Sequence, residues 1–146
     1  MNGMVMLTLS KYAIMKANLF AICFVLFVSV MSCERNEPTE IQIISADEMQ
    51  TLIDIEDVQV VDVRTPEEYE KGFIENAQNI DFNSPTFDAD IDKLDKSKPV
   101  VLYCQGGGRS AKCAAKLKGA GFVKIYDLEG GISQWEFKGK EVKTYF

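Results

Sequence analysis

The chain has 146 residues, of which 47% are apolar and 26% charged, a composition typical of one globular domain. Its net charge is −6, and the body after residue 32 is more acidic still, which argues against nucleic-acid binding. The chain contains no histidine, which excludes His-based catalytic triads and most zinc hydrolases, and no sequence feature calls for a metal or another cofactor.

An uncharged apolar run over residues 19–31 comes first and follows Lys16. It is short for a transmembrane helix, which takes about 20 residues, and typical of the apolar core of a secretory signal. The run ends in the letters VMSC, which resemble the bacterial lipobox, where the signal is cut before a cysteine that is then lipidated. We therefore expect residues 1–32 to be a lipoprotein signal peptide and Cys33 to anchor the protein to a bacterial membrane, facing the periplasm or the cell surface. The alternative is an uncleaved signal anchor with an incidental cysteine.

The start of the signal and the choice between inner and outer membrane stay open. Met15 directly precedes Lys16, so either Met1 or Met15 can be the true start. Residues 33–40 are polar, contain a proline and lack periodicity, which predicts a tether. Residues 41–146 then form the folded domain.

Short apolar runs alternate with helical patterns through this domain. The predicted strands are rich in β-branched residues and cover residues 41–44, 58–63, 77–80, 99–103 and 123–126. Ser45 with Glu48 forms a capping box that opens a helix through about residue 53, and Thr65 before a proline opens the next helix. Further helices are predicted over residues 86–94, 110–118 and 132–137.

This alternation predicts an α/β fold with right-handed crossovers and a mostly parallel sheet covered by helices on both faces. In such sheets, ligands bind beyond the carboxyl ends of the strands. Cys104 directly follows the predicted strand over residues 99–103 and therefore lies at such an end.

The loop after this strand is rich in glycine. Its residues are Cys104, Gln105, Gly106, Gly107, Gly108, Arg109 and Ser110. Successive glycines let several backbone N–H groups turn toward one point, and the helix that follows aims its positive end at the same point. With Arg109 nearby, each effect favours a thiolate at Cys104, which is the nucleophilic form and here needs no histidine base. A buried cysteine before a tight turn is the alternative, but it gives no reason for the glycines.

Three motifs in this order resemble those of rhodanese-like sulfurtransferase domains. The loop follows the family pattern of Cys, two variable residues, Gly, one more residue and Arg-Ser. VVDVRTPEEYEKGFIENAQNI resembles the upstream signature and LEGGISQW the closing motif, and the likeness runs from about residue 41 to residue 142. The matching positions are Asp62, Arg64, Glu68, Tyr69, Gly72, Ile74, Ala77, Cys104, Gly107, Arg109, Ser110, Gly130, Gly131 and Trp135.

The resemblance implies a five-stranded parallel sheet flanked by helices, and sulfur transfer through a persulfide on Cys104. Sulfane sulfur would come from thiosulfate, a persulfide or a polysulfide and pass to a thiol or cyanide. The implied partners are small sulfur-containing anions or thiols; a protein acceptor is not identified. The loop N–H groups would stabilise the thiolate and the persulfide, and Arg109 would attract an anionic donor. Asp62 and Arg64 are expected to brace the loop from the neighbouring strand.

Three positions depart from the family pattern. Phe73 replaces a histidine that usually follows Gly72, and Asn76 replaces a common glycine. Gly106 stands where thiosulfate-preferring members can carry a basic side chain, so the donor stays open.

Two other functions compete with sulfur transfer. Cysteine phosphatases and arsenate reductases also pair a loop cysteine with an arginine, but with five intervening residues, whereas four separate Cys104 from Arg109. The second rival is a non-catalytic or redox module of the same fold. Cys113 could then pair with Cys104, although its apolar neighbours predict a small buried core residue.

Overall fold

The structure is a computed structural model that describes residues 39–145. The predicted signal peptide, the lipidation of Cys33 and most of the predicted tether lie outside these residues and stay predictions. No helix within residues 39–145 combines the length and apolarity needed to cross a bilayer.

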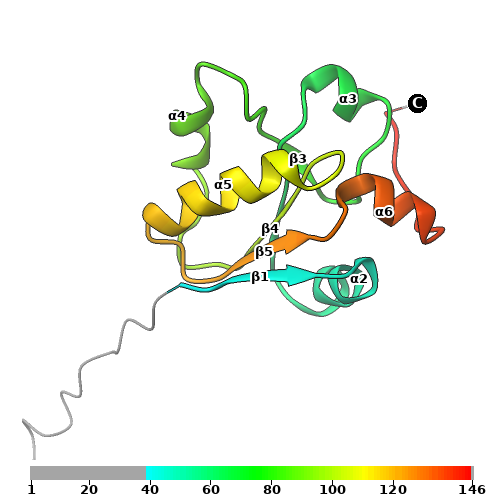
Figure 1. The fold of residues 1–146 in the computed structure, drawn as a ribbon, viewed down its shortest axis with the longest axis horizontal. Helices are drawn as coiled ribbons and strands as arrows, with labels where there is room; N and C mark the ends of the chain where they lie inside the picture. Colours follow the sequence, from blue (N-terminus) through cyan, green and yellow to red (C-terminus); the bar gives the residue numbers. More distant parts are fainter. Residues whose placement is uncertain (1–38, 146) are drawn as a thin grey trace, which may run out of the picture. The chain divides into compact units, whose positions relative to one another are not determined.

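Five parallel strands form one sheet with the order β1-β5-β4-β2-β3 (Figure 1). The strands are β1 (Ile41–Ile44), β2 (Gln59–Asp62), β3 (Gln78–Asn79), β4 (Val100–Tyr103) and β5 (Ile125–Leu128). The central strand β4 and its neighbour β5 are buried along their whole length, as expected for a sheet covered on both faces. The predicted α/β fold with a five-stranded parallel sheet is therefore confirmed.

Within residues 39–145, five helices connect and cover these strands. They are α2 (Ala46–Ile55), α3 (Pro66–Glu70), α4 (Phe87–Ile91), α5 (Gly108–Gly119) and α6 (Gly131–Phe137). Both predicted helix starts are confirmed: Ser45 with Glu48 and Thr65 with Glu68 form reciprocal capping boxes that satisfy free N–H groups of α2 and α3.

Alternating strand residues feed two hydrophobic cores, one on each face of the sheet. On one face, Val61, Leu102 and Ile125 pack against α4 and α5. On the other face, Val60, Val101 and Tyr126 pack against α2, α3 and α6. The period of two along each strand is thus what places Cys104 on the side of α5 and Tyr103 on the opposite side.

Several predicted boundaries are wrong by two or three residues. The last strand ends at Leu128 instead of residue 126, the helix predicted over residues 86–94 ends at Ile91, and two starts are displaced. The last strand begins at Ile125 instead of residue 123, because the ladder to Ile41 of β1 and Val100 of β4 starts there, while Val123 is largely exposed. Helix α5 begins at Gly108 instead of Ser110, because Gly107 adopts a left-handed φ of 98° and its carbonyl accepts the N–H of Ala111. The loop is therefore shorter than predicted.

All five strands run in the same direction, so their carboxyl ends share one edge of the sheet. The segments that follow β2, β4 and β5 meet there. These segments carry Arg64, Cys104 and Gly130, respectively, and this edge holds the candidate site.

Candidate active site

The loop that carries Cys104 is clamped to the start of α6. The N–H of Ile132 donates to the carbonyl oxygen of Cys104 at 2.9 Å, and the N–H of Ser133 donates to that of Gln105 at 3.2 Å. A side chain at Gly131 would meet the same backbone, since its Cβ would stand 2.3 Å from the Cys104 oxygen. Glycine at this position therefore permits the close approach that fixes the loop.

The sulfur of Cys104 lies at the amino end of α5, and the exposed fraction of Cys104 is 2%. The N–H of Gly107 donates to Sγ at 3.1 Å, and the hydroxyl of Ser110 lies 3.7 Å from Sγ. The Ser110 hydroxyl also lies 3.1 Å from the Gly107 carbonyl oxygen, which ties the first turn of α5 to the loop. The loop thus gathers donors around one sulfur atom.

These donors change the acidity of the thiol. Burial alone raises the pKa of Cys104, but hydrogen bonds from the backbone of Ser110, Arg109 and Gly106 and from the Ser110 hydroxyl outweigh it, so the pKa lies below its ordinary value. The positive end of α5 acts in the same direction. The site therefore favours a nucleophilic thiolate.

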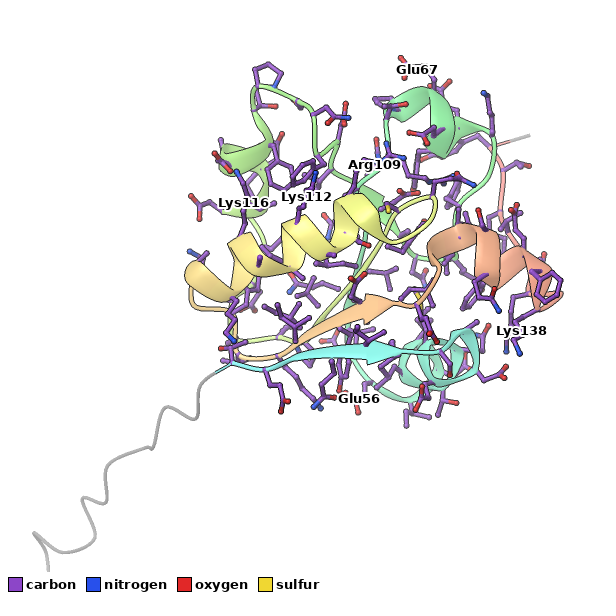
Figure 2. All side chains as sticks on the ribbon, in the orientation of Figure 1. Glu56, Glu67, Arg109, Lys112, Lys116 and Lys138 are labelled. Carbon is purple, nitrogen blue, oxygen red and sulfur yellow. The ribbon has the colours of Figure 1, made fainter. Side chains whose placement is uncertain are left out.

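The guanidinium of Arg109 is held by a carboxylate from another helix. Its Nη1 and Nη2 donate to the two carboxylate oxygens of Glu68 in α3 at 2.6 and 2.7 Å. Arg109 lies at the end of α5 nearest α3, and Lys112 and Lys116 follow along the helix away from it (Figure 2). The hydrogen bonds from Arg109 lower the pKa of Glu68 to about 2. Because Glu68 balances its charge, Arg109 attracts an anionic donor less strongly than a free arginine would.

Asp62 and Arg64 form a buried pair at the end of β2. Arg64 donates from Nε and Nη2 to the Asp62 carboxylate, with the shortest contact at 2.6 Å, and from Nη2 to the Gly72 carbonyl at 2.6 Å. Its Nη1 lies 3.4 Å from Oε1 of Gln105. Arg64 is therefore fixed on two sides, and it touches the Cys104 loop through the side chain of Gln105.

Cys113 provides an internal comparison for Cys104. Both cysteines are free, but Cys113 faces the core from the middle of α5 and is fully buried, as predicted. Burial raises the pKa of Cys113 to about 12. The same chain thus holds one thiol whose pKa is lowered and one whose pKa is raised.

The two departures near Gly72 fit their surroundings. Phe73 stacks on Tyr69 with ring centroids 4.5 Å apart and lies 5.0 Å from the ring of Tyr145. Asn76 has a left-handed φ of 64°, a conformation that asparagine tolerates better than most side chains and glycine tolerates best.

Three residues of the site were missed as functional positions. Glu68 holds Arg109, Ser133 accepts a hydrogen bond from Nε2 of Gln105 at 2.9 Å, and Gly131 makes room for the loop. Glu68 and Gly131 both belong to the recognised motifs, which was the only signal that they act together with the loop.

No cluster of three or more His, Cys, Asp or Glu side chains suited to a metal ion occurs within the described part of the chain. The chemistry that the site supports rests on the Cys104 thiolate and its hydrogen-bond donors.

Comparison with known proteins assigns the family. The model of the rhodanese-like domain matches residues 45–138. A tRNA uridine(34) hydroxylase of Yersinia pestis is 39% identical over 104 residues, which cover 67% of this chain but 29% of that protein. A rhodanese-related protein of Thermoplasma volcanium superposes with a TM-score of 0.63 at 30% identity, covering 70% of this chain and 97% of its own. A rhodanese-like domain protein of Staphylococcus aureus gives 0.62 at 32% identity, covering 72% and 99%. The chain belongs to the family of rhodanese-like domains.

Proposed function

We propose that this domain is a sulfurtransferase that carries sulfane sulfur as a persulfide on Cys104. The thiolate attacks the outer sulfur of a donor, the donor's S–S bond breaks, and its electron pair leaves with sulfite or a thiolate. A thiol or cyanide then attacks the terminal sulfur and releases the Cys104 thiolate. No external oxidant or reductant is needed, because sulfane sulfur only changes its partner.

The observation that carries the proposal is the convergence of donors on a single sulfur. The Gly107 N–H stands 3.1 Å from Sγ, and hydrogen bonds hold the pKa of Cys104 below its ordinary value. The same donors stabilise the negative terminal sulfur of a persulfide, which takes the place of the thiolate charge. Because the chain has no histidine, activation by this loop suits a reaction whose nucleophile is already ionised.

The donor that fits best is a persulfide or a polysulfide. Arg109 is neutralised by Glu68, and Gly106 adds no basic side chain, so no unpaired cation of the loop faces a dianion such as thiosulfate. A persulfide group carries at most one negative charge, whereas thiosulfate carries two, so a persulfide depends less on such a cation.

The similarity to the tRNA uridine(34) hydroxylase supports the assignment of the domain, but it does not support a hydroxylase activity for this chain. The aligned segment is 29% of that protein, so the rest of its machinery has no counterpart in the alignment. The length of the loop argues against the phosphatase alternative. Four residues separate Cys104 from Arg109, and they form a smaller ring than the five intervening residues of cysteine phosphatases.

The test is to incubate the full chain, solubilised in detergent, with polysulfide or thiosulfate and measure its intact mass. We expect one added sulfur atom on the wild type and on Cys113→Ser, and none on Cys104→Ser. The unchanged mass of the wild type would refute sulfur transfer. Hydrolysis of an aryl phosphate that depends on Cys104 would instead favour the phosphatase.

The sequence before the domain supports a place for this activity at the cell envelope, anchored through a lipid on Cys33. Incorporation of labelled palmitate into the wild-type chain, lost in Cys33→Ala, is the expected result. Equal labelling of both chains would refute the lipid site.

A further inference from the structure

A cavity of about 260 Å³ opens beside the catalytic loop. It is smaller than the sites of about 300–1,000 Å³ that hold drug-sized ligands, so it suits a molecule of amino-acid or short-peptide size. The residues that line it come from α3, from α6 and from the segments that follow β2, α3 and β4; they are Arg64, Glu68, Lys71, Gly72, Gln105 and Glu136.

Two of the lining residues connect the cavity to the reacting sulfur. Gln105 directly follows Cys104, and its amide is fixed between Nη1 of Arg64 at 3.4 Å and Oγ of Ser133 at 2.9 Å. Glu68 forms another part of the wall and binds Arg109. A molecule in the cavity therefore lies against the loop that presents the Cys104 sulfur.

The charges of the lining residues divide into paired and unpaired ones. Arg64 is paired with Asp62, and Glu68 is paired with Arg109. Lys71 and Glu136 form no ion pair within residues 39–145, and Lys71 acts on Glu67 only as the weakest influence on the pKa of that carboxyl. The cavity thus offers one free cation and one free anion at the same time.

We propose that this cavity binds a low-molecular-weight zwitterionic thiol, with its carboxylate at Lys71 and its ammonium at Glu136. The inference rests on the proposed function, because the bound thiol is the partner of the Cys104 persulfide. Its thiolate attacks the terminal sulfur, the bond from that sulfur to Sγ breaks, and the electron pair returns to Cys104. Read in reverse, the same step loads Cys104 from the persulfide of that thiol, so one site serves acceptor and donor.

The opposite charges give the site a selectivity that a purely cationic pocket lacks. A thiol with a carboxylate alone meets Lys71 but also Glu136, and a thiol with an ammonium alone meets the reverse problem. Only a molecule that carries both groups satisfies both side chains. Cysteine and glutathione each carry both charges, and they differ in size.

The experiment loads the full chain with sulfur from polysulfide and follows the discharge of the Cys104 persulfide by different thiols. Cysteine carries both charges, N-acetylcysteine the carboxylate, cysteamine the ammonium and 2-mercaptoethanol neither; glutathione tests the larger size. Rates are expressed as kcat/KM per thiolate, because the thiols differ in acidity. We expect cysteine or glutathione to exceed 2-mercaptoethanol by roughly tenfold or more, since one exposed ion pair changes an equilibrium by about fivefold.

Charge-reversal variants assign the two contacts. Lys71→Glu should abolish the advantage that a carboxylate gives, and Glu136→Lys the advantage that an ammonium gives, each by about fivefold. The matched controls are Lys118→Glu and Glu56→Lys, which reverse exposed charges outside the cavity. A purely structural effect would lower all rates by the same factor.

Three results separate the possible failures. If the persulfide forms but all thiols react equally, or if the cavity variants match the controls, the zwitterion site is refuted and the sulfurtransferase stands. If only one charged group improves the rate, the site is not zwitterionic and the inference is likewise refuted. If no persulfide forms on Cys104, both proposals are refuted.

Discussion

Replacing Gly131 by alanine tests whether contact with α6 sets the position of the loop that carries Cys104. The new methyl carbon would stand 2.3 Å from the Cys104 carbonyl oxygen, which is 1.1 Å closer than the 3.4 Å at which ordinary contact begins. That oxygen and the carbonyl oxygen of Gln105 accept the N–H groups of Ile132 and Ser133, so the loop must move by about 1 Å and both bonds weaken. A displacement of this size costs about 100-fold in rate.

The stability cost follows from the same contacts. The left-handed φ of 59° at Gly131 costs an alanine about 1 kcal/mol, and the two weakened hydrogen bonds cost about 1 kcal/mol each, for a loss of about 3 kcal/mol. Gly139→Ala is the matched control, because Gly139 has a similar φ of 73° but no atom within 4 Å of the new methyl group. It should lose only about 1 kcal/mol and keep its activity.

Urea denaturation measures the free energy of unfolding of both variants, and the rate of Cys104 alkylation together with kcat/KM for sulfur transfer measures the state of the loop. The reasoning is refuted if Gly131→Ala and Gly139→Ala show the same loss of stability and the same alkylation rate.

Three further predictions concern single side chains. Glu68→Gln should lower the free energy of unfolding by about 1 kcal/mol at pH 7, because Arg109 loses its charged partner. The folded pKa of Glu68 is depressed to about 2, so the contribution of the pair is present above about pH 4.5 and is lost as the pH falls toward 2. The urea midpoints of wild type and variant should therefore converge toward about pH 2. The same variant leaves Arg109 unpaired and should raise kcat/KM for thiosulfate about fivefold, and an unchanged value would contradict the role of Glu68 in donor choice. Asp127→Asn should stabilise the fold by about 1 kcal/mol at pH 7 and by less at pH 4 in thermal unfolding. Asp127 is buried, its Oδ1 has no hydrogen-bond partner within the described residues, and burial raises its pKa, so the ionised carboxylate destabilises the fold as the pH rises through that pKa. An equal effect at both pH values would disprove this cause. Asn76→Gly should stabilise and Asn76→Ala destabilise by about 0.5–1 kcal/mol each in urea denaturation, because φ is 64° there, and two equal midpoints would show that this backbone conformation carries no cost.

Local signals allowed most of the fold to be predicted from the sequence. The capping boxes at Ser45 and Thr65 depend on residues three positions apart, so the chain itself contains all the information that starts α2 and α3. The buried run before Cys104 likewise identifies β4 and places the cysteine at a strand end.

Contacts between distant segments could not be predicted in the same way. Glu68 and Arg109 are 41 residues apart, and the sequence around either residue does not identify the other as its ion-pair partner. The start of β5 was misplaced for a related reason: Val123 has the side chain of a strand residue, but pairing with β1 and β4 decides where the ladder begins. Tertiary partners, which one sequence does not reveal, therefore determined both the boundary and the ion pair.

The parallel direction of the strands separates the start of the domain at Ile41 from Cys104. The chain joins the domain at Ile41, the first residue of β1, at the amino edge of the sheet, whereas Cys104 follows the last residue of β4 at the carboxyl edge. Four residues of strand at about 3.3 Å each set these edges roughly 13 Å apart. The parallel strands therefore place Cys104 and Ile41 at opposite ends of the sheet.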